Sequence, residues 1–234
     1  MGGTLKGTAM LVYRDMKYQF VMFSLITLFV AFVFLMIGLF IETPIQAGVI
    51  FGPFYGLIAV YGGSAYVTSF RYAMGFGSTR TLFLKVFYTL GILFVIVVML
   101  FLNILYFIME GLYNLGVTRV SLFHIGNVTS FQKGFFPYLW VDIMIGIVLL
   151  GLVFFVTSLW YKYGFMRISI GSIILGVIAF LLLYNIGFQA AFQWMAHINH
   201  FTLFTGIGLV GLITLFSTYL FMRNAPLSYR SKKG

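Results

Sequence analysis

Side chains that could carry acid–base or metal chemistry are scarce in this sequence. Its 234 residues contain no cysteine. The acids are Asp15, Glu42, Glu110 and Asp142, and the histidines are His124, His197 and His200. Without cysteine, disulfides, thiol catalysis and cysteine metal sites are excluded. Four carboxylates in a chain of this length are very few for hydrolytic or metal chemistry.

The three histidines do not form a convincing metal site. His197 and His200 are three positions apart and could share one face of a helix. A zinc site needs three or four ligands, and His124 and Glu110 would join this pair only through the tertiary structure. We therefore predict no metal site and interpret the histidines as solvent-facing residues.

Asp142 is the acid with the most unusual position. It lies a few residues inside a long apolar stretch, and an acid in such a stretch is a functional candidate because its burial is costly. We expect water to reach it, since it lies near the end of the stretch. The apolar stretches offer no basic residue as an obvious partner. Proton relay through Asp142 is therefore an alternative hypothesis.

The segment 68–85 mixes aromatic, basic and glycine residues, whereas a passive loop would be shorter and more polar. We predict a short helix that is broken at Gly75-Phe76-Gly77, with Ser78 or Thr79 capping the helix that follows. Such a helix would present aromatic side chains and arginines to a partner. The proposed contact residues are Phe70, Arg71, Tyr72, Met74, Gly75, Phe76, Gly77, Thr79 and Arg80. The alternative is an ordinary interfacial loop.

Gly48, Gly52 and Gly56 repeat at the G-x-x-x-G spacing, which allows two helices to approach closely. Pro53 beside them can kink a helix. The pattern favours packing within the chain, and a bent helix at a seam between two subunits is the alternative.

The composition indicates the environment of these residues. Hydrophobic residues make up 62% of the chain and charged residues 8%. A soluble domain of ordinary composition is about 25% charged, so this chain is predicted to be an integral membrane protein. Its net charge of +10 is then explained by basic cytoplasmic loops, and we predict no binding of nucleic acid.

Six stretches are long enough to cross a bilayer as helices, which takes roughly 20 apolar residues. They are Phe20–Phe40, Ile45–Val67, Phe83–Met109, Phe136–Tyr161, Ile168–Gly187 and Phe201–Met222. The predicted fold class is therefore all-α, with a single transmembrane domain covering residues 1–234. The apolar segment Phe188–His200 is too short to span, and a re-entrant or interfacial helix is expected there.

Positive charge is distributed unequally between the two sides of this topology. Twelve of the fourteen Lys and Arg residues fall on one side, and only Arg119 and Lys133 fall on the other. Basic loops remain in the cytoplasm, so both termini are predicted to be cytoplasmic.

The first residues of the chain form a second signal. Leu5, Ala9, Val12, Tyr13, Met16 and Phe20 fall on one helical face, beside basic residues. This pattern predicts an amphipathic helix that lies in the inner interface, separate from the first span. A simple basic flank is the alternative.

The segment Met74–Phe83 resembles the region after the second span in permeases of the ABC-2 type, where a glycine and a variable pair precede Thr/Ser-Arg and an aromatic residue. The overall arrangement of spans is also similar to that family, and within it to the exporters of phenol-soluble modulins and related peptide toxins in Gram-positive bacteria. The motif covers about ten residues of the chain.

The resemblance implies a type V ABC exporter fold in the plasma membrane. It implies two permeases, identical in the simplest case, and two separate ATPase subunits that bind ATP and Mg. The segment Phe70–Arg80 would be the coupling helix, and the first, second and fifth spans would meet at the dimer seam. The chain contains no G-x-x-x-x-G-K-[ST] motif, so we expect it to bind no cofactor and to have no enzyme activity itself.

Two other classes stay open. One is an ion-coupled secondary transporter that uses Asp142, although charged midplane residues and inverted repeats are not evident. The other is a membrane-embedded enzyme that uses His197 and His200.

Overall fold

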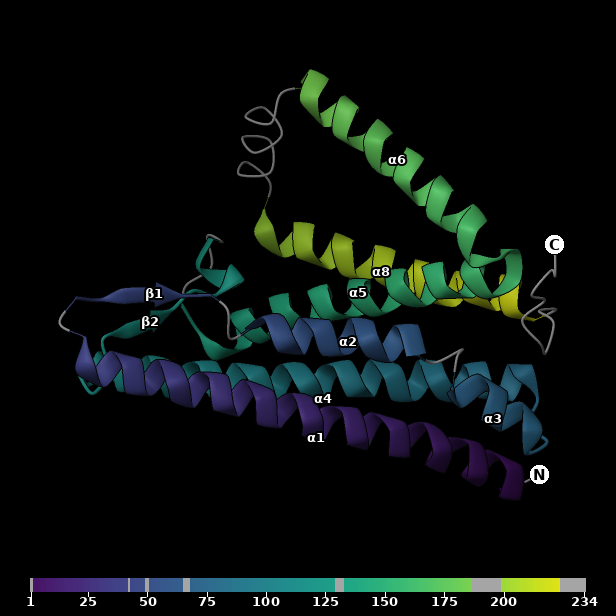
Figure 1. Cartoon of the computed structure of the whole chain (residues 1–234), viewed down its shortest axis with the longest axis horizontal. Coiled ribbons are helices and arrows are strands. Elements are labelled where there is room, and N and C mark those ends of the chain that lie inside the picture. The colour runs from purple at the N-terminus through teal and green to yellow at the C-terminus, as the bar shows by residue number, and fades with distance from the viewer. Residues whose placement is uncertain are drawn as a thin grey trace.

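The protein is an elongated bundle of helices in the computed structural model (Figure 1). The structure describes residues 2–41, 43–48, 51–64, 68–128, 133–186 and 199–223. Within these ranges five helices are long and apolar enough to cross a membrane. They are α1 (Gly2–Phe40), α4 (Arg80–Asn114), α5 (Phe135–Tyr163), α6 (Phe165–Ile186) and α8 (His200–Met222). The predicted all-α class is confirmed, and the helices are compatible with a multi-pass membrane protein.

The second predicted span takes a different form. Its first residues form strand β1 (Ile45–Ala47), and helix α2 (Gly52–Ser64) has 13 residues. At about 1.5 Å per residue such a helix is about 20 Å long, which is shorter than the roughly 30 Å of a bilayer core. The prediction of a full spanning helix over Ile45–Val67 is therefore wrong for the described residues. The strand forms because β1 pairs in parallel with β2 (Val120–Leu122).

The separate amphipathic helix predicted at the N-terminus is also wrong. Helix α1 continues from Gly2 to Phe40 as one element of 39 residues (Figure 1). Val12 and Met16 of the predicted apolar face are buried, whereas Leu5 and Tyr13 are exposed. The face does pack, but against helices of this chain, because Phe20 contacts Phe54 of α2 and Phe94 of α4 edge-to-face.

The tightest helix crossing joins α5 and α8, which lie side by side. A Cβ atom on Gly211 would lie 2.5 Å from the Cα atom of Val148, and one on Gly151 would lie 2.1 Å from the carbonyl oxygen of Gly211. The backbones approach this closely because neither glycine has a side chain. Gly151 and Gly211 thus allow the close helix packing that was predicted for the glycines of the second span.

The glycines singled out on the second span do not pack within the chain. A Cβ atom on Gly52 or Gly56 would meet no atom within 4 Å, and one on Gly48 would only touch Phe123. Pro53 is the second residue of α2, in the first turn, where a missing N–H does not interrupt the helix. The favoured interpretation of intrachain packing is therefore wrong for Gly52 and Gly56, whose face is open, and Pro53 does not kink α2.

The elements define two ends of the bundle (Figure 1). One end, called the loop end here, carries β1, β2 and the short helix η2 (Ile125–Val128). The other end carries the start of α1, the helix α3 (Ser69–Gly75) and the end of α8, and is called the α3 end. Twelve Lys and Arg residues were assigned to one side of the topology, and those that the structure describes lie on elements at the α3 end. Arg119 and Lys133 lie at the loop end. The unequal charge distribution thus exists in space as well as in sequence.

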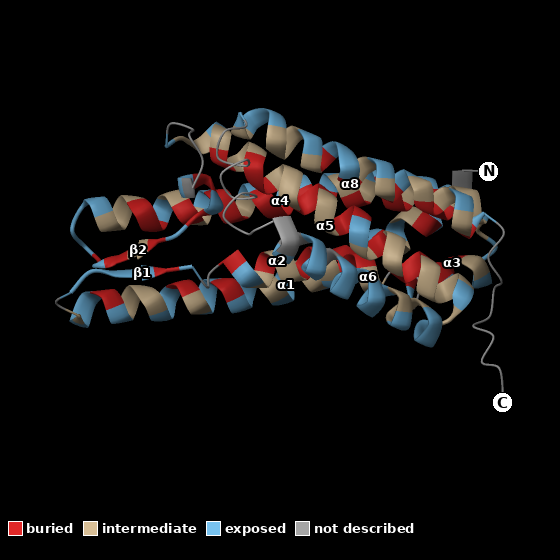
Figure 2. Ribbon diagram, turned by 90° about the horizontal axis from the view of Figure 1, so that it is seen from above, coloured by how far each residue is buried: buried red, intermediate tan, exposed pale blue. Residues whose placement is uncertain are grey.

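Buried residues are concentrated on α4 and α5, whereas α6 is mainly exposed (Figure 2). An aromatic column forms this core: Phe87 stacks on Tyr61 of α2 and on Phe154 of α5, with ring centroids 5.1 and 4.1 Å apart. Helix α6 diverges from α5 and α8 (Figure 1), and it exposes Ile173 and Leu175 among other apolar residues. The bundle therefore has one well-packed core and one apolar helix that makes few contacts within the chain.

Candidate functional site

Helix α3 is the short helix predicted in the segment 68–85. It ends at Gly75, and Gly77 has a φ of 80°, a conformation that glycine adopts without strain. Thr79 caps α4, because its side-chain oxygen accepts a hydrogen bond from the N–H of Leu82 at 3.2 Å. The predicted helix, its break and its capping threonine are all present, so the sequence determines this local structure well.

The apolar side chains of α3 divide into an inner and an outer set. Phe70 is only 1% exposed and packs edge-to-face on Phe83 of α4 and Tyr161 of α5. Tyr72 and Phe76 are 63% and 77% exposed. The expectation that Phe70 faces a partner is therefore wrong, since it anchors α3 to the bundle, and Met74 is half-buried. The outward surface consists of Tyr72 and Phe76.

The arginines of this segment also differ in position. Arg71 is exposed on α3. Arg80 is half-buried, and its guanidinium donates a hydrogen bond to the carbonyl oxygen of Arg223 after α8, at 3.3 Å. Arg80 thus joins the start of α4 to the end of α8, and only Arg71 lies where a rim residue of an interface is expected.

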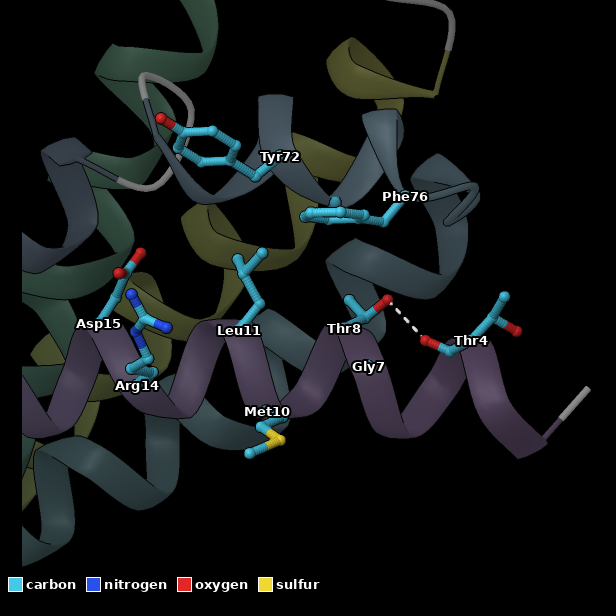
Figure 3. A pocket seen from close by; sticks show the side chains of 10 residues that line it. Thr4, Gly7, Thr8, Met10, Leu11, Arg14, Asp15, Tyr72 and Phe76 are labelled. Carbon is cyan, nitrogen blue, oxygen red and sulfur yellow. Dashed lines mark hydrogen bonds between the residues drawn. The ribbon is translucent and has the colours of Figure 1, made fainter.

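A pocket of about 700 Å³ separates α3 from the first turns of α1 (Figure 3). Gly7, Leu11 and Arg14 line it from α1, and Tyr72 and Phe76 line it from α3. The α1 side of this pocket was not predicted from the sequence. The available signal was the spacing of Gly7, Leu11 and Arg14, which places them on one face of a helix.

The pocket has a fixed frame. Asp15 accepts a hydrogen bond from Ser69 at the start of α3, and Thr8 hydrogen-bonds to Ser78 after its end. These two contacts hold α3 against α1 at both ends. Between them lies a mainly apolar pocket with exposed aromatic residues and the cation Arg14, which is suited to bind a protein segment.

Asp142 occupies a second site, at the loop end of the bundle. Its side chain is fully buried. Tyr55 and Asn103 donate hydrogen bonds to its two oxygens at 2.8 and 2.9 Å, and the Nε2 atom of His124 lies 3.1 Å from Oδ2. The expectation that water reaches Asp142 is wrong, because the loop that carries His124 covers it.

His124 is buried as well, with 1% of its side chain exposed, so its interpretation as solvent-facing is wrong. Glu110 pairs with Lys133 and does not join His124. Asn103 was missed, although a polar residue within an apolar span is a recognised signal. His200 begins α8, whereas His197 and most of the segment 188–200 lie outside the described residues.

No group of three or more His, Asp or Glu residues in the described part of the chain is placed to hold a metal ion. The two sites therefore differ in nature: the pocket beside α3 is open and mainly apolar, and the cluster around Asp142 is closed and polar. Comparison of the chain with protein-family models, curated proteins and solved structures finds no match.

Proposed function

We propose that the chain is the transmembrane subunit of an ATP-driven ABC exporter. The observation that carries this proposal is α3, a short helix that exposes Tyr72 and Phe76 while Phe70 anchors it to α4 and α5. A partner that contacts the exposed side could move the bundle through this anchor. The chain has no nucleotide-binding motif of its own, so ATP and Mg bind to the partner.

The path from α3 into the bundle is aromatic. Phe70 contacts Phe83, which stacks at 6.1 Å on Phe87, and Phe87 stacks on Phe154 of α5. Rigid, closely packed rings transmit a displacement better than mobile side chains, because the interior has little free volume. The proposed ATPase subunits would act on this column, one on each of two permeases.

A second copy of the chain is the proposed partner within the membrane. The open glycine face of α2 at Gly52 and Gly56, and the exposed apolar sides of α1 and α6, support an interface in this region. The spans that correspond to α1, α2 and α6 form the dimer seam in the family that the sequence resembles. The cargo would pass along this apolar seam, which favours amphipathic peptides over hydrophilic solutes.

The proposed topology has six crossings in the plasma membrane with both termini in the cytoplasm. The successive helices α1, α2, α4, α5, α6 and α8 run alternately towards the loop end and towards the α3 end (Figure 1), although α2 alone is shorter than a bilayer core. The cations at the α3 end support a cytoplasmic location for that end.

This topology is tested by labelling single cysteines in a chain that has none of its own. Leu115→Cys at the loop end should react with an impermeant maleimide in intact cells, because its position is exposed. Tyr163→Cys at the α3 end, which is also exposed, should react only after permeabilisation. The reversed pattern would overturn the orientation. Labelling of both positions in intact cells would place them on the same side of the membrane and would overturn the single crossing by α5 between them.

The coupling role is tested by Phe76→Ala. We expect ATPase binding to weaken by about 2 kcal/mol, or roughly 30-fold, because an exposed aromatic residue at a protein contact contributes most of its free energy on burial. The measurement is the binding of candidate cassette ATPases to the purified chain and their rate of ATP hydrolysis with it. Phe136→Ala is the matched control, since Phe136 is 79% exposed but lies at the loop end.

Equal ATPase binding by the wild-type chain, Phe76→Ala and Phe136→Ala would contradict the assignment of α3.

The ion-coupled alternative receives less support, because the buried residues of α5 between Asp142 and Thr157 are apolar: Gly146, Ile147, Leu150, Gly151 and Phe154. Such a stretch gives protons no polar route along α5 towards the α3 end.

A further inference from the structure

The hydrogen bonds of the buried histidine at the loop end select one tautomer of its neutral ring. The backbone N–H of Gly126 donates to Nδ1 of His124 at 2.8 Å, so this nitrogen must be the unprotonated one. The proton of the neutral ring therefore sits on Nε2 and points at Oδ2 of Asp142, 3.1 Å away. The ring is held between Tyr138, stacked at 4.6 Å, and Phe51, edge-on at 5.0 Å.

With a neutral ring and an ionised Asp142, the cluster carries one uncompensated negative charge. Asp142 is fully buried and receives three hydrogen bonds, from Tyr55, Asn103 and His124. None of these donors is a cation. Burial of a carboxylate without a positive partner is costly even when its oxygens are hydrogen-bonded. The cluster therefore gains from binding one positive charge.

A single proton can enter this site at Nδ1 of His124. A proton on Oδ2 of Asp142 would oppose the N–H groups of Asn103 and His124, and one on Oδ1 would require the hydroxyl of Tyr55 to turn from donor to acceptor. A proton on Nδ1 displaces only the Gly126 N–H and creates an imidazolium whose Nε2–H faces the carboxylate, which is a charge-assisted hydrogen bond. Histidine is also the side chain that ordinarily changes charge between about pH 5 and pH 8.

This protonation cannot occur without movement of the turn that holds Gly126, because two N–H groups cannot face each other. The turn has little room: a Cβ atom on Gly126 would lie 2.7 Å from a ring carbon of Tyr138. The next residue, Asn127, donates its N–H to the carbonyl oxygen of His124 and accepts a hydrogen bond from the hydroxyl of Tyr138 at 2.6 Å. A displaced turn therefore pulls on α5.

From this geometry we propose that His124 and Asp142 form a one-proton site at the loop end, and that its occupation releases the turn 124–127 from the bundle. A lower pH on the loop side would then loosen the turn 124–127, which covers the ends of α2, α4 and α5. The proposed exporter function requires no role for this site, so the two proposals hold or fail independently of each other.

The surroundings of the site contain few charges. Tyr106 of α4 lies 4.9 Å from the His124 ring, Tyr138 stacks on it, and Tyr55 faces Asp142 from α2. Glu110 interacts electrostatically with the hydroxyls of Tyr106 and Tyr138, and Lys133 with that of Tyr138, but Glu110 and Lys133 pair with each other. Among the described residues, Asp142 is thus the charge that His124 contacts.

The experiment follows the turn through strand β2, which precedes it. Ser121→Cys in the full-length chain carries a bimane fluorophore, and its emission is measured in lipid nanodiscs from about pH 8 to about pH 5. We expect one transition with the slope of a single proton. His124→Gln should abolish the transition, because the glutamine amide can still donate to Asp142 but does not bind a proton in this range.

His200→Gln is the matched control, with the same substitution at another histidine, and it should keep the transition and its midpoint. A transition that persists in His124→Gln, or its absence from the unsubstituted reporter protein, would overturn the proposal. If His124→Gln fails to fold, nitrogen NMR of ring-labelled histidines in the otherwise unchanged chain decides. An Nδ1 signal that stays unprotonated throughout the fluorescence transition would equally refute it.

Discussion

Gly211→Leu should separate α5 from α8 and unfold much of the bundle. The added Cβ atom would lie 2.5 Å from the Cα atom of Val148, and the backbone cannot move aside as a flexible side chain would. We expect a loss of about 3 kcal/mol or more in the free energy of unfolding, at the upper end of overpacking effects. The measurement is thermal denaturation of the purified chain in detergent, together with its yield of monodisperse protein.

Gly206→Leu provides the control on the same helix. A Cβ atom at position 206 meets no atom within 4 Å, so leucine there should be neutral or stabilise the helix by up to about 1 kcal/mol through its propensity. If Gly211→Leu were as stable as Gly206→Leu, the close crossing of α5 and α8 would be refuted.

Asp142→Ala should have the second large effect, at the loop end. It leaves the hydroxyl of Tyr55, the amide of Asn103 and the Nε2–H of His124 without their buried acceptor. Asn103 is affected most, because its carbonyl oxygen already has no hydrogen-bond partner. Each unsatisfied buried donor costs about 1–3 kcal/mol, so we expect a total loss of about 3 kcal/mol or more.

Thermal denaturation again measures this loss, and Asp15→Ala is the matched control. Asp15 is half-buried at the α3 end and accepts a hydrogen bond from Ser69. Water can replace that hydrogen bond, so its loss should cost about 1 kcal/mol or less. Similar stabilities for Asp142→Ala and Asp15→Ala would mean that Asp142 is hydrated, contrary to its burial.

The sequence predicted the long helices well because their signal is local. The predicted starts and ends of the spans Phe136–Tyr161 and Phe201–Met222 differ by two residues or fewer from α5 and α8. Long apolar runs can satisfy their backbone polar groups in a membrane only as helices. The one proline in these two spans, Pro137, lies in the first turn of α5, where a missing N–H does not interrupt the helix. The capping role of Thr79 was equally local, since a cap depends on the next three residues of the chain.

The segment 45–67 was predicted wrongly because its first residues have a partner that is distant in the sequence. Ile45 pairs with Val120, which lies after the third predicted span, and this pairing turns the start of the expected helix into a strand. Apolar composition alone does not separate a strand that has such a partner from a spanning helix.

The sequence by itself determined that this chain is all-α, apolar enough for a membrane, basic mainly at one end, and equipped with a short helix between Ser69 and Gly75. These properties depend on composition and on neighbouring residues. Only the tertiary structure decided that Phe70 is an internal anchor while Phe76 is exposed, and that Asp142 meets His124 under a closed loop. Which side of a helix is covered, and which polar groups meet in the interior, depend on contacts between residues far apart in the chain.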